Sequence, residues 1–383
     1  MKKRVIIYHN ILWSRYKGRV FSEIERIQRT SPSEFSISFI QIAETDSDRK
    51  FLGGSGRQGH DYPFELLYRG SYEAIGTLRL SRRLLTHAIR SNADLLLLPG
   101  WGRVEFCALL FGAMVSGKKV GMFCDSTKLD NPSSIYRNLL KRAFARCCVG
   151  FFCYGERARE YLLSVGASEK GIFIRCQAAA LPPTYDARIV RDARIAARAN
   201  QRHSARFLYV GRLSPEKCVG SLIEAFDIVR SSVPDAMLRI VGDGPLRYEI
   251  QSTVQRLNLN SCVEVVGSLT EGRLVDEYIH ALCLVLPSSS EPWGLVVNES
   301  LSYGCPAIVS DRCGCIPELI SDGETGLVFS ALNTAQLAAQ MISATRLFSS
   351  TPVVADACIN RISRFTPQAA AEQILSGISA VLK

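Results

Sequence analysis

Two carboxylates eight positions apart and a pair of bases form the part of this sequence best suited to chemistry. Glu291 and Glu299 lie in the run EPWGLVVNES, and the bases Arg212 and Lys217 lie upstream in VGRLSPEK. An Arg guanidinium can hold a phosphate through two parallel hydrogen bonds, and a Lys ammonium adds a mobile charge. Carboxylates accept hydrogen bonds from hydroxyl groups. Together, the four side chains could hold a diphosphate and a hydroxyl-bearing group.

The run LVLPSSSEPWG determines how the carboxylates are positioned. It predicts a strand at Leu284–Leu286, a polar turn, and a helix from about Gly294 to Tyr303. The unpaired N–H groups at a helix start form a site for phosphate, and a glycine lets a ligand approach the backbone closely. Glu291 then lies on the loop and Glu299 in the second helical turn, so both can face one ligand. The alternative is a loop charge and a solvated helix face.

The bases follow a second predicted strand, Phe207–Val210. The segment from Gly211 to Glu216 is a turn, and a helix starts near Val219. Arg212 therefore lies just past the carboxyl end of the strand, and Lys217 lies just before the helix. Ligands of open α/β sheets bind at that edge. The alternative is an ordinary basic loop.

Two further segments repeat the pattern of strand, turn and helix. MLRIVGDGPLRYEI contains Gly242-Asp243-Gly244-Pro245, which is similar to a nucleotide-binding loop but lacks a third glycine. SYGCPAIVSDRCGCIPELISDGETGLVF contains a buried strand at Ala307–Ser310 and a tight turn at 323–326.

In this order and spacing, the four segments resemble the retaining glycosyltransferases of family four, over roughly Arg206 to Leu337. The resemblance implies that Arg212 and Lys217 hold the donor diphosphate, Glu291 the transferred sugar and Glu299 the ribose. Trp293 stands where the family usually has Phe. The resemblance also implies that residues of nearby loops contact the donor: Gly211, Gly242, Ser268, Trp293, Gly294 and Leu295.

The same resemblance implies a fold and an activity. The fold would be α/β of the GT-B type, with two Rossmann-like doubly wound domains facing across a cleft and a C-terminal helix that crosses back to the N-terminal domain. The enzyme would move a hexose-type sugar from a UDP- or GDP-sugar to a glycan or lipid-linked acceptor, as in exopolysaccharide or lipopolysaccharide synthesis. It would retain the anomeric configuration and need no cofactor and no divalent metal.

The chain length and element pattern suit two domains. We expect an acceptor-binding domain at 1–185, a polar linker at 186–204, a donor-binding domain at 205–366 and a C-terminal helix at 367–383. The middle of the linker, Asp186–Ala199, is rich in Arg and Ala and could form a short helix. Strands alternate with helices through the first half, which indicates parallel sheets. The predicted strands there include Val5–Tyr8, Phe35–Ile42, Leu95–Leu98, Val120–Cys124 and Val149–Cys153, and the predicted helices include Phe21–Thr30, Tyr72–Ser91 and Ser133–Ala145.

The acceptor side is expected in the first half. Asp125 follows the strand Val120–Cys124 at its carboxyl edge, where the resemblance implies a sugar contact; the alternative is an N-cap of the next helix. The loop after the first strand also reaches the predicted cleft. The expected acceptor-side residues are Arg15, Tyr16 and Lys17 in that loop, and Lys128 and Arg137 after Asp125.

The positive charge is concentrated in the first half. Of the 46 Lys and Arg residues, 32 precede residue 201, against 18 of the 36 Asp and Glu residues. A basic face prefers anionic partners. Because no nucleic-acid module is recognisable, an anionic membrane surface or a charged acceptor fits better. Without a signal peptide or a long apolar run, we expect a cytoplasmic protein, with possible peripheral contact to the inner membrane face.

The remaining patterns are weak. The 13 cysteines include no Cys-x-x-Cys pair, which favours reduced, packed thiols over metal sites or disulfides. The run Gly54 to Gly59 satisfies G-x-G-x-x-G but follows no buried strand, and Asp46-Ser47-Asp48 lies in a polar loop. The functional alternatives are therefore a GT-B-type sugar-nucleotide epimerase, a non-catalytic nucleotide-sugar binding module and, on the glycines alone, an NAD-dependent oxidoreductase.

Overall fold

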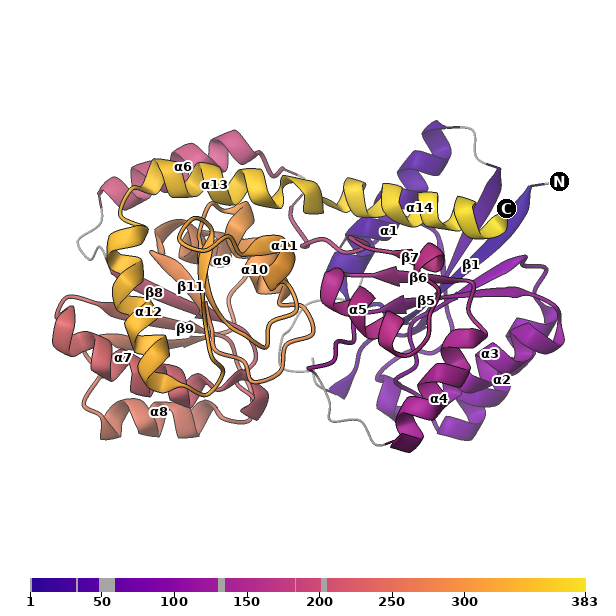
Figure 1. The fold of residues 1–383 in the computed structure, drawn as a ribbon, viewed down its shortest axis with the longest axis horizontal. Helices are drawn as coiled ribbons and strands as arrows, with labels where there is room; N and C mark the ends of the chain where they lie inside the picture. Colours follow the sequence, from indigo (N-terminus) through magenta and orange to yellow (C-terminus); the bar gives the residue numbers. More distant parts are fainter. Residues whose placement is uncertain (1, 32–33, 48–58, 130–134, 183, 201–204) are drawn as a thin grey trace. The chain divides into compact units, whose positions relative to one another are not determined.

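The computed structural model describes the chain apart from residues 1, 32–33, 48–58, 130–134, 183 and 201–204 (Figure 1). The described chain divides into two compact units. The first contains Met1–Ala180 and Phe365–Lys383, and the second contains Leu181–Arg364. Each unit has its own parallel sheet.

The first unit has a seven-stranded sheet in the order β3-β2-β1-β4-β5-β6-β7. Its strands are β1 (Lys3–Ile11), β2 (Phe35–Ala43), β3 (Phe64–Leu66), β4 (Leu95–Leu98), β5 (Lys119–Cys124), β6 (Gly150–Cys153) and β7 (Ile172–Phe173). Its helices are α1 (Arg15–Thr30), η2 (Tyr72–Ala74), α2 (Thr77–Arg90), α3 (Glu105–Val115), α4 (Ile135–Arg146), α5 (Glu156–Ser164), η3 (Glu169–Gly171) and α14 (Pro367–Leu382).

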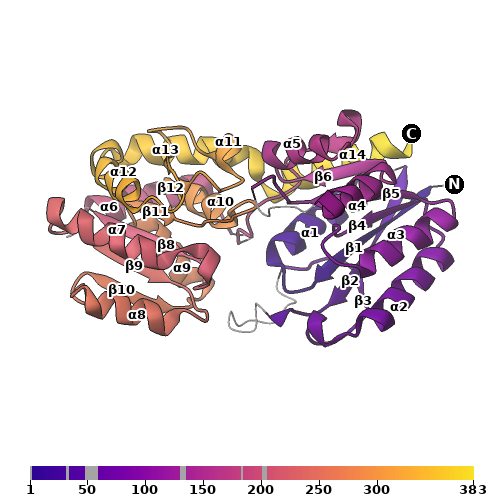
Figure 2. The ribbon, with the colours of Figure 1, turned by 60° about the horizontal axis from the view of Figure 1, so that its bottom comes forward.

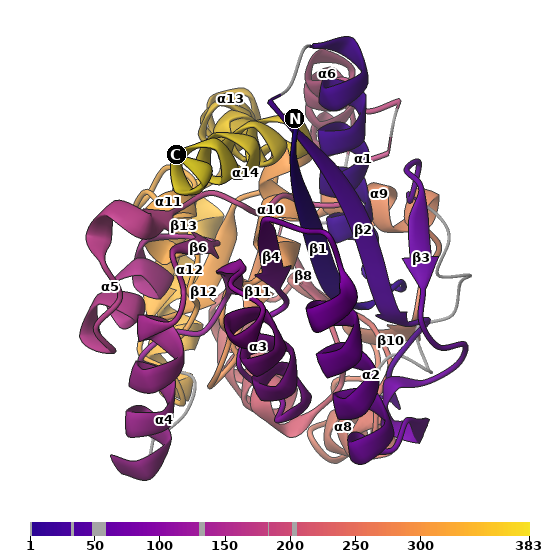
Figure 3. The same ribbon diagram turned by 90° about the vertical axis from the view of Figure 1, so that its right-hand side faces the viewer.

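Alternate strand residues feed two cores, one on each face of this sheet. Leu95 and Leu97 pack in a cluster with residues of α1 and α14, whereas Leu96 and Leu98 pack in a cluster with residues of α2 to α5. Figure 3 shows α2, α3 and α4 together in one layer. The last helix of the chain therefore completes the core of the first unit.

The second unit has a six-stranded parallel sheet in the order β10-β9-β8-β11-β12-β13 (Figure 2). Its strands are β8 (Arg206–Val210), β9 (Met237–Val241), β10 (Val263–Gly267), β11 (Cys283–Leu286), β12 (Ala307–Ser310) and β13 (Gly326–Phe329). Its helices are α6 (Ala187–Ala199), η4 (Pro215–Lys217), α7 (Val219–Ser232), α8 (Arg247–Arg256), α9 (Glu271–His280), α10 (Leu295–Ser302), α11 (Ile316–Leu319), α12 (Thr334–Leu347) and α13 (Thr351–Ile362), and η5 (Ser363–Phe365) follows at the unit boundary.

The strand order reverses between β8 and β11, which are hydrogen-bonded neighbours through Cys283 and Phe207. The chain proceeds from β8 outward through β9 and β10, and then returns to β11 on the other side of β8. The loops that leave β8 and β11 therefore start from neighbouring carboxyl ends, which is the place where ligands of open α/β sheets bind.

Helix α1 begins earlier than the sequence analysis predicted. The predicted helix Phe21–Thr30 begins instead at Arg15, so the expected loop at 14–18 is largely the first turn of the helix. Lys17 lies on the buried face with Val20, Phe21 and Ile24. A charged residue at this apolar position concealed the helical spacing.

The predicted helix Tyr72–Ser91 is interrupted. It consists of the turn η2 and helix α2, with Gly76 as the extended N-cap of α2. Glycine is a poor helix former because its backbone loses much entropy on ordering. The three-residue strand β3 was not predicted from the sequence.

The short helix expected within the linker is α6, and it packs against α13 and α9 in the second unit. Its buried Arg194 donates hydrogen bonds to the carbonyl oxygens of Tyr278 (2.7 Å) and Leu282 (3.3 Å) at the end of α9. A cation at a helix C-terminus satisfies carbonyls that lack intrahelical partners. Residues 54–58 of the glycine-rich run, and Asp48, lie outside the described residues.

Candidate active site

Lys217 and Glu291 meet at the point where the order of the second sheet reverses. Lys217 ends the short turn η4 after β8, and Glu291 lies on the loop after β11. The Lys217 Nζ forms an ion pair with the Glu291 Oε2, and both side chains are only 14% exposed. The base predicted for the diphosphate and the acid predicted for the sugar are therefore in direct contact.

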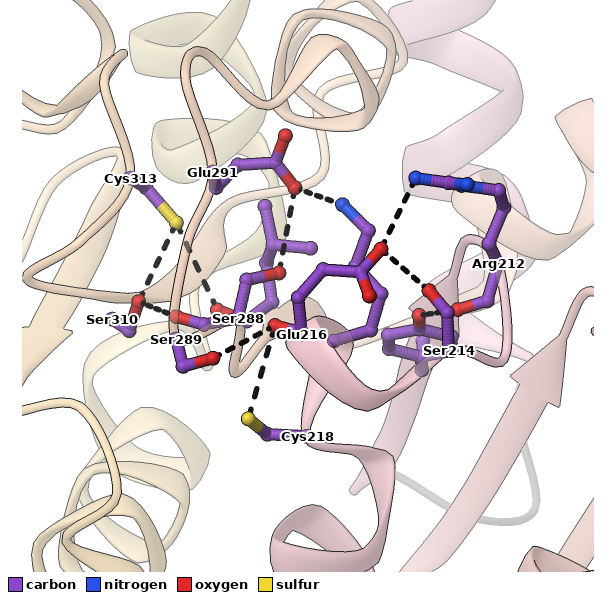
Figure 4. Close-up of polar contacts among 12 residues, drawn as sticks. Arg212, Ser214, Glu216, Cys218, Ser288, Ser289, Glu291, Ser310 and Cys313 are labelled. Carbon is purple, nitrogen blue, oxygen red and sulfur yellow. Dashed lines mark hydrogen bonds and ion pairs between the residues drawn. The ribbon is translucent and has the colours of Figure 1, made fainter. Parts of the chain in front are cut away.

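Arg212 has a carboxylate partner of its own. Its guanidinium lies 3.1 Å from the Oε1 of Glu216, which also accepts a 2.6 Å hydrogen bond from the Ser214 Oγ (Figure 4). Burial raises the pKa of Glu216, but the Ser214 hydrogen bond and the Arg212 charge outweigh it and lower that pKa overall. Sequence reasoning missed Glu216, although its position in GRLSPEK was visible.

Backbone hydrogen bonds join the loop after β11 to the loops after β8 and β12. The Ser289 N–H donates to the Glu216 carbonyl oxygen at 2.9 Å, and the Gly314 N–H donates to the Glu291 carbonyl oxygen at 2.9 Å. A Cβ at Gly314 would lie 1.7 Å from the Pro292 oxygen, so only glycine fits there. Gly314 was also missed, because nothing in its own segment indicates contact with the loop at 291–293.

The charges of this cluster balance. Arg212 and Lys217 are each paired with a glutamate, so the four side chains carry no net charge when all are ionised. The sequence predicts instead that both bases are available to a diphosphate. A diphosphate held by both bases would instead replace or share their carboxylate partners, in competition with an existing attraction.

Helix α10 begins beside this cluster. Gly294 is its N-cap, with φ 97°, and a Cβ there would lie 3.1 Å from Leu286 Cδ2 and 3.5 Å from Glu291 Cγ. The left-handed turn thus needs glycine and directs the positive end of α10 toward the Glu291 loop. The Trp293 indole is buried and donates a 2.7 Å hydrogen bond to Asn298, and the Trp293 carbonyl oxygen accepts one from the Cys315 N–H at 3.1 Å.

Glu299 lies in α10 but faces a different group of residues. The Tyr278 hydroxyl donates to its Oε2 at 3.0 Å, and the Tyr278 ring stacks on Tyr303. Burial raises the pKa of Glu299 to about 7; the Tyr278 hydrogen bond opposes this shift and the Glu271 charge adds to it. Arg194 of α6 holds the backbone of Tyr278, so the predicted linker helps to shape the Glu299 environment.

Close packing accounts for Gly242 in the Gly-Asp-Gly-Pro run at 242–245. Gly242 has φ 144°, and a Cβ there would lie 1.8 Å from the Gly211 oxygen. The Leu213 N–H donates to the Asp243 oxygen at 3.0 Å, so these glycines let two loops of the sheet edge pack closely. Ser268 is exposed just after the edge strand β10, away from the reversal between β8 and β11.

Residues predicted for the acceptor side lie at the carboxyl edge of the first sheet. Asp125 is exposed after β5, too far before Ile135 to be the N-cap of α4, which excludes that alternative. Lys128 is exposed, and Arg15 and Tyr16 are half-buried in the first turn of α1. The side chain of Arg137 lies outside the described residues.

Lys17 is buried, contrary to the expectation of an accessible loop base. Its Nζ lies 4.6 Å from the centroid of the Phe123 ring and 4.8 Å from that of Tyr154. In the described part of the chain, this nitrogen has no hydrogen-bond partner. Burial lowers the pKa of Lys17 to about 8, and Cys176 and Asp125 oppose the shift.

All 13 cysteines are free thiols, and most are buried. Among the described residues, no group of three or more His, Cys, Asp or Glu side chains is arranged to hold a metal ion. Within the same residues, none of the helices is long and apolar enough to cross a membrane.

Comparison with known proteins agrees with this geometry. Residues 191–347 match the family model described as Glycosyl transferases group 1. The chain is 33% identical over 148 residues to the glycogen synthase of Mycobacterium tuberculosis, covering 39% of this chain and 36% of the relative. The chain thus matches only about a third of that relative's length. Over residues 191–347, the chain is similar to the group 1 glycosyl transferases.

Solved structures match both units. HepE from Anabaena, crystallised with UDP and glucose, aligns over 98% of this chain and 99% of its own, with a TM-score of 0.71 and 15% identity. A putative UDP-N-acetylglucosamine 2-epimerase from Listeria monocytogenes aligns over 99% and 96%, with a TM-score of 0.66 and 15% identity. At such identities the likeness concerns the fold alone, and it confirms the predicted GT-B fold of two Rossmann-like units.

Proposed function

We propose that this protein transfers a hexose-type sugar from a nucleotide diphosphate sugar to an acceptor hydroxyl, with retention of the anomeric configuration. The observation that carries the proposal is the contact between Lys217 and Glu291 where the order of the second sheet reverses. A base suited to the phosphate and an acid suited to sugar hydroxyls must lie within one donor molecule's length, and here they touch. The UDP and glucose in the HepE crystal support a UDP-sugar as the first donor to test, with GDP-sugars next.

In the proposed reaction, the bond between the anomeric carbon and the diphosphate oxygen breaks, and negative charge grows on the leaving group. Arg212, Lys217 and the N-terminus of α10 stabilise that charge as it develops, which lowers the barrier. These groups supply positive charge without a divalent metal. Glu291 accepts hydrogen bonds from the sugar hydroxyls and fixes the ring.

The acceptor oxygen forms the new bond on the face that the diphosphate leaves, and its proton passes to the departing phosphate oxygen. Glu299 would accept hydrogen bonds from the ribose hydroxyls of the donor. Asp125 of the first unit remains the proposed contact on the acceptor side. We further propose a glycan or a lipid-linked saccharide as acceptor, in cell-surface polysaccharide synthesis on the cytoplasmic side.

A donor screen tests this proposal. The protein is incubated with UDP- and GDP-sugars, with and without saccharide acceptors, and the nucleoside diphosphate released is measured. Transfer predicts release that rises when the correct acceptor is added. Binding without release would identify a non-catalytic nucleotide-sugar module.

An epimerase is the second candidate, because the putative epimerase of Listeria monocytogenes shares the fold. An epimerase changes a stereocentre of the sugar and needs acid and base groups placed at that carbon. Formation of an epimeric nucleotide sugar without acceptor-dependent release, followed by NMR, would favour this candidate over transfer.

A further inference from the structure

Helix α3 of the first unit presents large apolar side chains to the outside. Phe111 is 60% exposed, Met114 50%, Val115 58% and Val104 66%, and Cys107 is also exposed. These positions recur at helical spacing, so they form one stripe along the outer side of α3. A contiguous apolar surface of this kind marks an interaction site rather than ordinary surface composition.

The neighbouring helix extends the stripe into a broader face. A Cβ at Gly112 of α3 would lie 2.9 Å from both Ala88 Cβ and the Leu85 oxygen of α2, so the two helices are packed very closely. Leu78 and Ile89 of α2 add exposed apolar surface. Figure 3 shows α4 in the same layer, and its Leu139 and Leu140 are 55% and 71% exposed.

The charge on this layer has a single sign. Helices α2 and α4 carry four Lys or Arg residues each and no acid, and the one acid of the three helices, Glu105 of α3, is buried. Two acids near this layer are paired with arginines, Glu65 with Arg83 and Glu73 with Arg103. In the described part of the layer, the exposed charges are therefore basic, as with Arg82, Arg90, Arg142 and Arg146.

We propose that the outer face of α2, α3 and α4, called here the α2–α4 face, rests on an anionic lipid bilayer. Basic side chains attract anionic head groups, and Phe, Met, Leu and Val side chains enter the boundary with the acyl chains. Nucleic acid would satisfy the charges but not the exposed apolar side chains. A second copy of the chain would bring arginines against arginines, because a symmetric contact pairs the same surface with itself.

Cosedimentation with vesicles tests the proposal. The full chain is mixed with vesicles of phosphatidylcholine alone, or of phosphatidylcholine with phosphatidylglycerol, at low and high salt. We expect binding to the anionic vesicles that weakens as salt screens the charges, and little binding to the neutral ones. Equal binding to both vesicle types, or anionic binding that is insensitive to salt, would overturn the proposal.

Paired substitutions separate the two contributions. Arg82→Glu with Arg90→Glu should weaken anionic-vesicle binding by about fivefold or more for each charge removed. Phe111→Ser with Met114→Ser should weaken it at both salt concentrations. The matched control is Tyr248→Ser with Arg256→Glu in α8 of the second unit. Both residues are exposed, and their replacement should leave vesicle binding unchanged.

The other possible occupants give distinct results. If the α2–α4 face joins two copies, Phe111→Ser with Met114→Ser would abolish self-association in ultracentrifugation and leave vesicle binding unchanged. If a protein covers it, the pure chain would bind neither vesicle type. Both results contradict the proposal. Because the face lies outside the Lys217–Glu291 site, UDP-dependent thermal stabilisation should survive in all these variants, which separates failure of this proposal from failure of sugar transfer.

Discussion

At the scale of single residues, the site relies on ionisable groups that are partly removed from water. Lys217 and Glu291 neutralise each other, as do Arg212 and Glu216. Glu299 and Lys17 are the exceptions. Burial raises the pKa of Glu299 and lowers the pKa of Lys17, which favours the neutral form of each side chain. Their titration therefore gives measurable consequences near neutral pH.

Glu299 should make stability fall as pH rises. Its pKa of about 7 lies above that of an unfolded Glu, so between pH about 4.5 and about 7 the folded state holds a proton that the unfolded state has lost. Glu299→Gln should remove this slope and stabilise the protein by about 3 kcal/mol above pH 7. Urea unfolding at pH values on either side of that window measures both effects. An unchanged slope in the variant would contradict the assignment.

Replacing Lys17 should stabilise the fold. Its pKa of about 8 lies below that of an unfolded Lys, so the buried ammonium is unfavourable at neutral pH, and wild-type stability should rise with pH between about 8 and about 10. Lys17→Met should raise the free energy of unfolding by about 3 kcal/mol at pH 7. Lys128→Met, at an exposed position, is the control. A destabilised Lys17→Met would show that the ring contacts outweigh burial.

At the scale of elements, the loops after β8 and β9 depend on each other. Gly242→Ala would place a Cβ 1.8 Å from the Gly211 oxygen, so one loop must move. We expect a loss of about 2–4 kcal/mol of stability and weaker nucleotide binding. Gly220→Ala is the matched control, since nothing lies within 4 Å of that helical glycine and alanine should stabilise α7 slightly. Wild-type nucleotide affinity in Gly242→Ala would contradict this coupling.

The elements around the site could be predicted because their signals are local. Strand Ala307–Ser310 and the helix following Gly294 rest on apolar runs and glycine turns that need no distant partner. The earlier start of α1 was missed because Lys17 occupies a buried position, and the role of α6 was missed because Arg194 finds its carbonyl partners far away in sequence.

The same distinction holds for the site residues. Lys217 and Glu291 could be named from sequence, since each follows a strand at the expected edge. Their ion pair could not, because it depends on β8 and β11 being neighbours. The loop contact of Gly314 has the same cause: tertiary packing, and not local propensity, decides which loops touch.

At the scale of the whole molecule, the first unit is discontinuous in sequence and depends on the last helix. Ala370, Ala371, Ile374 and Ile378 of α14 are buried in its core. Ile374→Ala should lower the stability of the first unit by about 2–5 kcal/mol, and Gln368→Ala, at the start of α14, should be nearly neutral. Unfolding is followed with and without UDP, and the transition that UDP stabilises is assigned to the second unit. Ile374→Ala should leave that transition unchanged. A shift of that transition instead would contradict the division.

The central claim is that Lys217 and Glu291 act together on the donor sugar and its diphosphate. Its most direct test is the rate of sugar transfer by Lys217→Ala and Glu291→Ala, with Lys170→Ala as an exposed control and circular dichroism to check folding. Each site variant should remain folded and lose about a hundredfold in turnover, as expected when one group that stabilises the transition state is removed, and Lys170→Ala should match the wild type. Turnover near the wild-type rate in both site variants would contradict the account.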